Sequence, residues 1–146
     1  MVSVRRATHA DMPDIYAAAR SLAKSVDIAH LTTTNLYAHL TTIFAMPGVR
    51  IYLAEEDMVV GMLGVGIHPF LWNPLMMEMS ELFFWVYPGS PPTAALMLLR
   101  RVFADAEKEK INLATFATMP TSSDKVASVY ARFGLKPLQT MYQREF

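Results

Sequence analysis

Cysteine is missing from the 146-residue chain, which excludes disulfide bonds, thiolate nucleophiles and cysteine-based zinc sites. An excess of charge of either sign is missing too, because 13 Lys and Arg residues balance 13 Asp and Glu residues. A neutral chain lacks the positive field by which proteins bind nucleic acid or anionic membrane surfaces. We therefore expect a cytoplasmic protein with neither nucleic acid nor a membrane as a partner.

The sequence also lacks an uninterrupted apolar run long enough to cross a membrane. Residues 58–77 are strongly apolar, but Gly61, Gly64, Pro69 and Pro74 interrupt them in a way typical of strands and loops. No apolar segment follows the basic residues near the N-terminus, so we expect neither a signal peptide nor a transit peptide. Repeats and linkers are absent as well, and a hydrophobic content of 53% suits a single domain over residues 1–146.

Hydrophobic periodicity predicts an α+β domain with the element order βααβββαβαβ. Alternating or continuously apolar segments predict strands over residues 2–7, 49–54, 58–67, 77–87, 111–119 and 138–146. Apolar residues spaced three and four apart predict helices over 13–26, 36–44, 93–110 and 126–133. Residues 69–74 are predicted to form a loop, since prolines bound them.

Helix-capping residues support this division of the chain. Thr8 or Asp11 can cap the first helix, and the polar cluster at residues 32–35 can cap the second. Ser90 followed by Pro91 resembles an N-cap with proline in the first helical position, and Ser122 or Ser123 can cap the last helix.

Two segments carry most of a resemblance to a known family. Residues 81–88 read Glu-Leu-Phe-Phe-Trp-Val-Tyr-Pro, similar to a fourth strand that ends in Val-x-Pro, and residues 129–135 are similar to a Leu-Tyr-x-x-x-Gly-Phe segment. With the element order, and with weaker matches at residues 4–8, 53–56 and 59–61, nearly the whole chain resembles the GNAT superfamily of acetyl-coenzyme-A-dependent N-acetyltransferases. The resemblance implies a mixed, mostly antiparallel sheet flanked by helices.

The resemblance also implies an activity, namely acetyl transfer from acetyl-coenzyme A to the amine of a small molecule or peptide by direct attack. A backbone N–H near Val86 would polarise the thioester. Tyr130 matches the tyrosine that protonates the departing thiolate, and Glu81 could act as general base, with Glu78 as a weaker substitute. Each has a plain structural alternative: Tyr130 as a core residue with a hydrated tip, and Glu81 as a solvated or salt-bridged residue.

The loop after the fourth strand departs from the family. Gly89, Ser90, Thr93, Ala94 and Ala95 would offer groups to the cofactor pyrophosphate, as helix N-termini do. Pro91 and Pro92 have no N–H to offer, and the usual Arg/Gln-x-x-Gly-x-Gly pattern is absent. Residues 94–100 look like GNAT-like proteins of bacteriophages. The alternative function is therefore an inert GNAT-fold structural or interaction protein, for example within a phage particle.

Histidines do not indicate a metal site, because no pair has the i, i+4 spacing on one helix together with a third ligand. His30, beside Asp27, falls in the loop that borders the acceptor amine in this fold, so it could contact a substrate. Residues 70–72 read Phe-Leu-Trp, an apolar segment that could cover the acceptor cleft or pack against a second subunit of a homodimer.

Overall fold

The computed structural model describes residues 1–118 and 124–146, and within them the chain forms five strands and four α-helices. In chain order these are β1 (Ser3–Arg6), α1 (Met12–Ser25), α2 (Leu36–Ala45), β2 (Val49–Glu55), β3 (Val59–Phe70), β4 (Asn73–Val86), α3 (Thr93–Lys108), β5 (Leu113–Thr115) and α4 (Asp124–Arg132). Two short 3-10 helices, η1 (His9–Asp11) and η2 (Ala29–Leu31), precede α1 and α2. The predicted α+β class is confirmed, as is the predicted order as far as the last helix.

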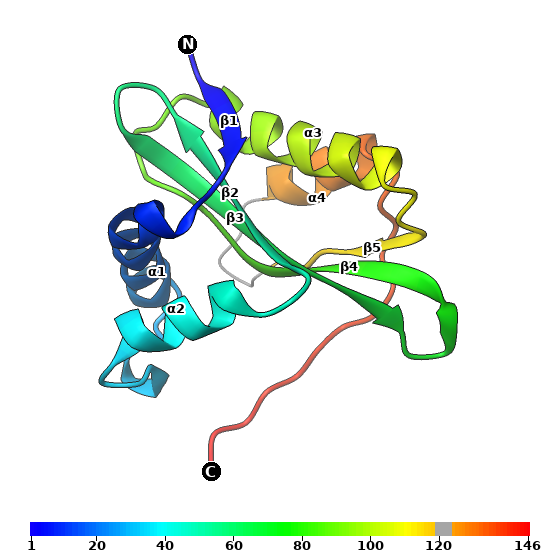
Figure 1. Cartoon of the computed structure of the whole chain (residues 1–146), viewed down its shortest axis with the longest axis horizontal. Coiled ribbons are helices and arrows are strands. Elements are labelled where there is room, and N and C mark those ends of the chain that lie inside the picture. Colours follow the sequence, from blue (N-terminus) through cyan, green and yellow to red (C-terminus); the bar gives the residue numbers. More distant parts are fainter. Residues whose placement is uncertain (119–123) are drawn as a thin grey trace.

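The strands form one mixed sheet in the order β1-β2-β3-β4-β5. The first three pairings are antiparallel, and β4 pairs with β5 in parallel. Helices α1 and α2 lie on one face of the sheet, and α3 and α4 lie on the other (Figure 1). Each face therefore has its own hydrophobic cluster, one around Ile15, Leu53 and Met62 and the other around Leu63, Leu98 and Val102.

The long helices follow the apolar spacing of the sequence. In α1 the residues Met12, Ile15 and Ala18 are buried, as one face of an amphipathic helix requires. The second helix begins at its predicted cap, because the Asn35 side chain accepts a hydrogen bond from the Ala38 N–H at 3.4 Å. Helix α3 buries Leu98, Leu99 and Val102, three of the residues predicted to face the core.

A β-bulge at Leu82 changes which side chains of β4 face which helices. Gly64 pairs with Phe83 and the next residue, Val65, pairs with Glu81, so Leu82 is the extra residue. Before the bulge, Met79 packs into the cluster under α3 and α4; after it, Phe84 packs there. These two positions differ by five residues, whereas an unbroken strand places only residues an even number apart on one face. Glu81 lies two residues after Met79 and so shares its face, and the bulge brings Phe84 and Val86 to that same α3 and α4 side.

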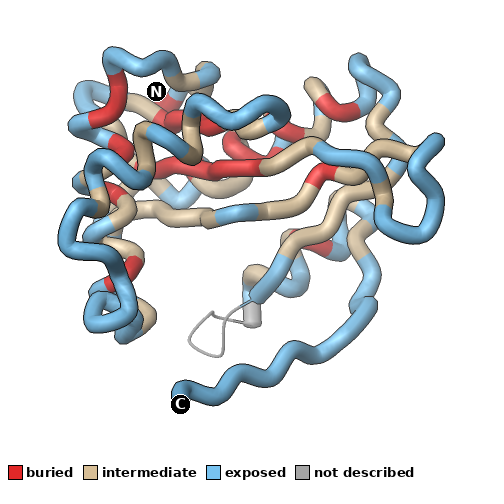
Figure 2. The backbone as a smooth tube through the Cα atoms, turned by 60° about the horizontal axis from the view of Figure 1, so that its bottom comes forward, coloured by how far each residue is buried: buried red, intermediate tan, exposed pale blue. Residues whose placement is uncertain are grey.

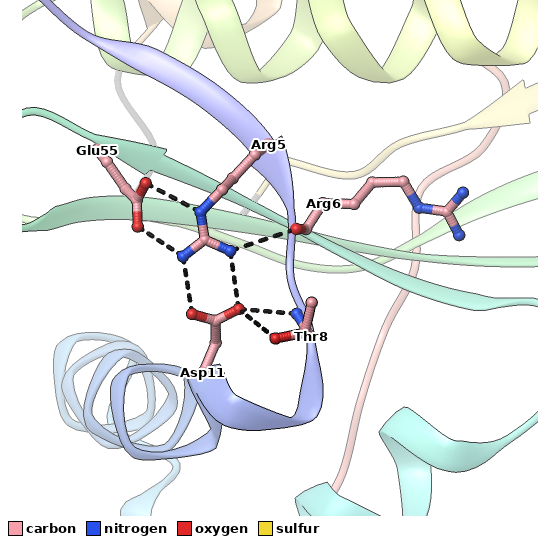
Figure 3. Close-up of polar contacts among 5 residues, drawn as sticks. All are labelled: Arg5, Arg6, Thr8, Asp11 and Glu55. Atoms are coloured by element: carbon pink, nitrogen blue, oxygen red, sulfur yellow. Dashed lines mark hydrogen bonds and ion pairs between the residues drawn. The ribbon is translucent and has the colours of Figure 1, made fainter.

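A network of charged side chains joins the N-terminal strand to the rest of the domain (Figure 3). The Arg5 guanidinium donates to both carboxylate oxygens of Asp11, at 2.9 and 2.8 Å, and to both of Glu55, at 3.0 and 2.7 Å. Asp11 also accepts the backbone N–H of Thr8 at 2.7 Å, which caps η1. One guanidinium thus connects β1, β2 and the start of the first helical segment with bidentate geometry on both sides.

Three local predictions are corrected by the structure. The predicted loop over residues 69–74 is almost entirely strand, because β3 and β4 turn tightly at Leu71 and Trp72. Ser90 is not the cap of α3; the N-cap is Pro92, and the Ser90 hydroxyl donates to the Val60 carbonyl at 3.2 Å instead. Of the strand predicted over residues 111–119, the described residues form only the three of β5, Leu113–Thr115. Ser122 and Ser123, the predicted caps, lie outside the described residues.

The predicted final strand over residues 138–146 is wrong for the single chain. The chain after α4 forms neither helix nor strand, and every residue from 136 to 146 is exposed (Figure 2). A strand needs a neighbouring strand to bond with, and within residues 1–118 and 124–146 no strand pairs with the C-terminal segment.

Candidate active site

The candidate site lies where β4 and β5 separate. The two strands pair only from Glu78 to Ser80, opposite Leu113 to Thr115. On its other edge β4 stays paired with β3 as far as Val86. The edge of β4 that would face β5 is therefore left open from Glu81 onward. Openings of this kind between strands expose backbone N–H groups to a ligand.

The backbone of Val86 points its N–H into this opening. Residues of a strand direct their N–H groups alternately to the two edges. Because the Tyr87 N–H donates to the Val60 carbonyl of β3 at 2.9 Å, the N–H of the preceding residue, Val86, is directed away from β3. The strand end thus presents one oriented donor on the open edge.

A cavity of about 210 Å³ occupies the same place. Its lining combines two polar side chains with apolar ones: Glu81, Phe84, Val86, Ala95, Ala117, Val126 and Tyr130. Strand β4, the first turn of α3, the segment after β5, and α4 all contribute. Three separate predictions, Glu81 on the fourth strand, Val86 at its end and Tyr130 on the last helix, therefore converge on one cavity.

Glu81 and Tyr130 contact one another inside this cavity. The Tyr130 hydroxyl donates to the Ala117 carbonyl at 3.0 Å and, more weakly, to the Glu81 carboxylate at 3.4 Å. The Ala117 N–H donates to the same Glu81 oxygen at 3.0 Å. Ala117 was not predicted, and no sequence signal marks it, because it acts through backbone atoms that every residue has.

Burial shifts the pKa of both groups upward. Removal from water raises the pKa of Glu81, and the hydrogen bonds from Ala117 and Tyr130 offset only part of that effect. Burial also raises the pKa of Tyr130, reinforced by the neighbouring Glu81 charge. At neutral pH the tyrosine therefore keeps its proton, and Glu81 is a stronger base than an exposed carboxylate.

The loop that follows β4 has few free donors. The Ser90 N–H donates to the Tyr87 carbonyl at 3.1 Å and the Ala94 N–H to the Pro91 carbonyl at 3.0 Å. Gly89 has φ +82°, and nothing lies within 4 Å of the place where a side chain would begin. Of the predicted pyrophosphate contacts, Gly89 and Thr93 therefore offer the more accessible N–H groups, and Ala95 lines the cavity itself. The side-chain and backbone donors of Ser90 are both engaged within the chain.

The histidines lie elsewhere. His30 contacts Glu145 at 2.9 Å, and His68 contacts Ser80 at 3.0 Å, both at exposed positions outside the cavity. A larger cavity of about 730 Å³ lies among α1, η2 and the start of α2, and none of the predicted catalytic residues lines it. It is an open surface hollow without the paired acid and base, so we place the chemistry in the smaller cavity.

The described residues contain neither a metal-binding cluster nor a membrane-spanning helix. Within residues 1–118 and 124–146, no group of three or more His, Asp or Glu side chains is placed to hold a metal ion. Across the same part of the chain, no helix has the length and apolar character needed to cross a bilayer.

Comparison with known proteins shows a similarity in structure that the sequences do not reveal. No protein-family model matches the chain, and no curated protein does. Solved structures match over nearly the whole length.

A predicted acetyltransferase from Clostridium acetobutylicum, solved with acetyl-CoA, has a TM-score of 0.74 at 16% identity and covers 99% of this chain and 96% of its own. The ribosomal-protein-alanine N-acetyltransferase from Brucella melitensis has a TM-score of 0.76 at 13% identity, with 99% of each chain covered. An aminoglycoside acetyltransferase from an uncultured soil sample, in complex with sisomicin, has a TM-score of 0.77 at 11% identity and covers 99% and 96%. Identities this low speak to architecture alone, and on that evidence the chain has the fold of the GNAT acetyltransferases.

Proposed function

We propose that this protein transfers an acetyl group from acetyl-coenzyme A to the amine of a small molecule or peptide by direct attack. The observation that carries the proposal is the Glu81–Tyr130 contact at 3.4 Å in the opening between β4 and β5. A half-buried base and a buried acid that share one cavity beside an oriented backbone N–H form the set of groups that acyl transfer to an amine requires.

The residues present fit the cosubstrate at the acyl end. The open edge of β4 and the apolar side chains of Phe84, Val86 and Val126 suit an extended, largely uncharged arm. Gly89 and Thr93 would hold the phosphates at the start of α3. Acetyl-coenzyme A supplies a thioester whose carbonyl carbon takes the new bond to nitrogen as the bond to sulfur breaks.

The chain's own groups manage the protons. The Glu81 carboxylate accepts the proton that the amine loses as it attacks, and its raised pKa suits that role. The Val86 N–H donates a hydrogen bond to the carbonyl oxygen as negative charge develops there. Tyr130 donates its proton to the departing sulfur. Because Tyr130 touches Glu81, the proton from the amine can then return to Tyr130, which restores both groups.

A second candidate is an inert protein that keeps the fold without binding the cosubstrate, for instance a component of a phage particle. The loop favours it, because Pro91 and Pro92 lack N–H groups and the N–H groups of Ser90 and Ala94 are engaged within the chain. A hydrogen-bonded acid and base in a cavity favours the enzyme instead, since packing alone could be met by apolar side chains.

The test begins with calorimetric titration of the purified protein with acetyl-coenzyme A, checked by thermal stabilisation. Saturable micromolar binding supports the enzyme and justifies an assay of free thiol release with primary amines, including an aminoglycoside and peptide N-termini. No binding at millimolar concentration favours the inert protein and removes the catalytic roles.

Substitution of Tyr130 then tests the chemistry. We expect Tyr130→Phe to lower turnover about 10²-fold, at the lower end for a general acid, while binding of acetyl-coenzyme A changes little. Tyr52→Phe is the matched control, because Tyr52 is a buried tyrosine that donates to Asp105 at 2.9 Å outside the cavity. Equal turnover of Tyr130→Phe and the wild type would remove Tyr130 from the mechanism.

A further inference from the structure

The C-terminal tail, residues 136–146, lies outside the domain with its bonding capacity unused. Among the described residues, no backbone hydrogen bond involves any of these positions; the last one on this side of α4 is donated by Leu135. Among the described residues, the tail makes one hydrogen bond with the body, between the exposed side chains of Glu145 and His30 at 2.9 Å. Its backbone is therefore available to a neighbouring strand.

The tail has three large apolar residues on one side of an extended backbone, a side that also carries Arg144, while the exposed Met141 lies on the other. Leu138, Tyr142 and Phe146 are spaced four apart, so an extended backbone places them on the same side. Their exposed fractions are 81%, 93% and 106%. Large apolar side chains that remain this exposed on a monomer, in a contiguous segment, are typical of a surface that another protein covers.

The sheet has an edge that matches the tail. Strand β5 is the last strand of the sheet, and only β4 pairs with it in the described part of the chain. Its second edge is unpaired, although the three residues of β5 are half-buried. An open strand edge is a template for a further strand from another chain.

The tail does not pair with the open β5 edge of its own chain. The tail leaves α4 after Gly134, which has φ +79° and ends the helix, and then passes across to the α1 and α2 side, where Glu145 meets His30 (Figures 1 and 2). One chain thus carries an unpaired strand-like segment and an unpaired strand edge, and a second copy carries the complement of both.

We propose that two copies of this chain form a symmetric dimer in which the tail of each adds as a strand to the β5 edge of the other. A two-fold axis makes both contacts equivalent, so each copy donates one tail and receives one. Backbone hydrogen bonds extend each sheet by one strand, and Leu138, Tyr142 and Phe146 become covered. The dimer does not depend on the proposed acetyl transfer.

The first test is the mass in solution. We expect sedimentation and light scattering to give twice the 16.4 kDa of the chain at micromolar concentration. Replacing Leu138, Tyr142 and Phe146 by Ser should weaken association by about tenfold or more. Met58→Ser is the control, because Met58 is an apolar side chain 73% exposed in the turn between β2 and β3. A monomer at all concentrations, or a dimer unaffected by the triple substitution, would overturn the proposal.

The second test identifies which segments meet. The chain has no cysteine, so Thr140→Cys in the tail and Thr118→Cys just beyond β5 are unique attachment points for a short bismaleimide. A mixture of the two single variants should give a cross-linked dimer, and neither variant alone should. A protein that carries both substitutions provides a further check. If it cross-links only within one chain, or if Thr140→Cys alone forms a cross-linked dimer, the tail does not add to the β5 edge of a partner.

Discussion

Asp11 and Glu81 are both carboxylates largely shielded from water, and the structure treats them in opposite ways. Asp11 accepts two N–H groups from Arg5 and one from Thr8, and the guanidinium holds the pKa of Asp11 well below its ordinary range. Glu81 has one backbone N–H and one weak tyrosine bond, no cation of the described residues pairs with it, and burial raises its pKa. The opposite directions of the two pKa shifts fit different tasks: a structural one for Asp11, and for Glu81 the proposed role of proton acceptor.

Measuring activity after each carboxylate is made neutral is the strongest test of the difference between Asp11 and Glu81. Glu81→Gln keeps the shape of the side chain but cannot accept a proton, so turnover should fall by about 10²–10⁴-fold. Asp11→Asn should leave turnover within about twofold of the wild type when measured well below its melting temperature. Similar losses in both variants would show that Glu81 also has a structural task.

Stability should show the reverse order. Asp11→Asn removes one of the two negative partners of Arg5, and Glu55 remains. We expect a loss of about 1–2 kcal/mol in the free energy of unfolding at pH 7, reduced because Arg5 is partly exposed. The pKa of Asp11 is lowered in the folded protein, so the stabilisation is present above the ordinary aspartate value and disappears as pH falls through the lowered one. Denaturant unfolding from pH 7 down to pH 2 measures how the difference between wild type and variant begins to narrow below the ordinary aspartate pKa.

The matched control for that experiment is Glu109→Gln. Glu109 pairs with Arg50 on the surface, and its side chain is 38% exposed, so the loss should stay below about 1 kcal/mol. A larger loss at Glu109 than at Asp11 would contradict the idea that the Arg5 network is the main ionic connection of the N-terminal strand.

Glu81→Gln should stabilise the protein slightly while it destroys activity. The raised pKa means that the folded state disfavours the ionised form, so neutralising it should add up to about 1 kcal/mol at pH 8. The gain should shrink as pH falls below the folded pKa, because the wild-type carboxyl then becomes protonated by itself. Thermal unfolding at pH 8 and pH 5 checks the sign, and a clear destabilisation at pH 8 would contradict it.

The smallest effect concerns the coupling between the two cavity groups. The Tyr130 hydrogen bond lowers the pKa of Glu81, so Tyr130→Phe should move the acidic limb of the pH–rate profile to higher pH. At 3.4 Å the bond is weak, so this shift should be the smallest of the expected effects. A shift to lower pH would show that this limb reports a different group.

Much of the fold could be predicted from the sequence because each helix is specified by residues that lie close together in the chain. The spacing of Ile15 and Ala18, the Asn35 cap and the apolar stripe of α3 each specify a helix from neighbouring residues. The final strand was not readable in the same way, because alternation says that a segment can pair but not whether a partner exists beside it. A helix forms its hydrogen bonds within one segment, whereas a strand needs a second strand, so the tail could not be assigned from its own residues.

The sequence indicated residues for the candidate site but not the geometry that joins them. Resemblance alone indicated Glu81, Val86 and Tyr130, and the structure brings all three to one cavity. The hydrogen bonds to Ala117 and the Leu82 bulge have no signature in residue identity, since one uses backbone atoms and the other is a property of pairing register. The Arg5 network likewise joins residues up to 50 positions apart, beyond the reach of local patterns.

The bulge at Leu82 means that the site depends on the number of residues between Glu81 and Val86 as well as on their identities. Glu81 and Phe84 share a face although three positions separate them, an odd number that a regular strand forbids. A relative could keep the glutamate, the valine and the tyrosine, lose one residue between the first two, and carry its carboxylate on the wrong side of the sheet. Such a chain would keep all three residue types but would lack the carboxylate in the cavity. The number of residues between the glutamate and the valine is therefore a criterion for deciding which relatives share the chemistry.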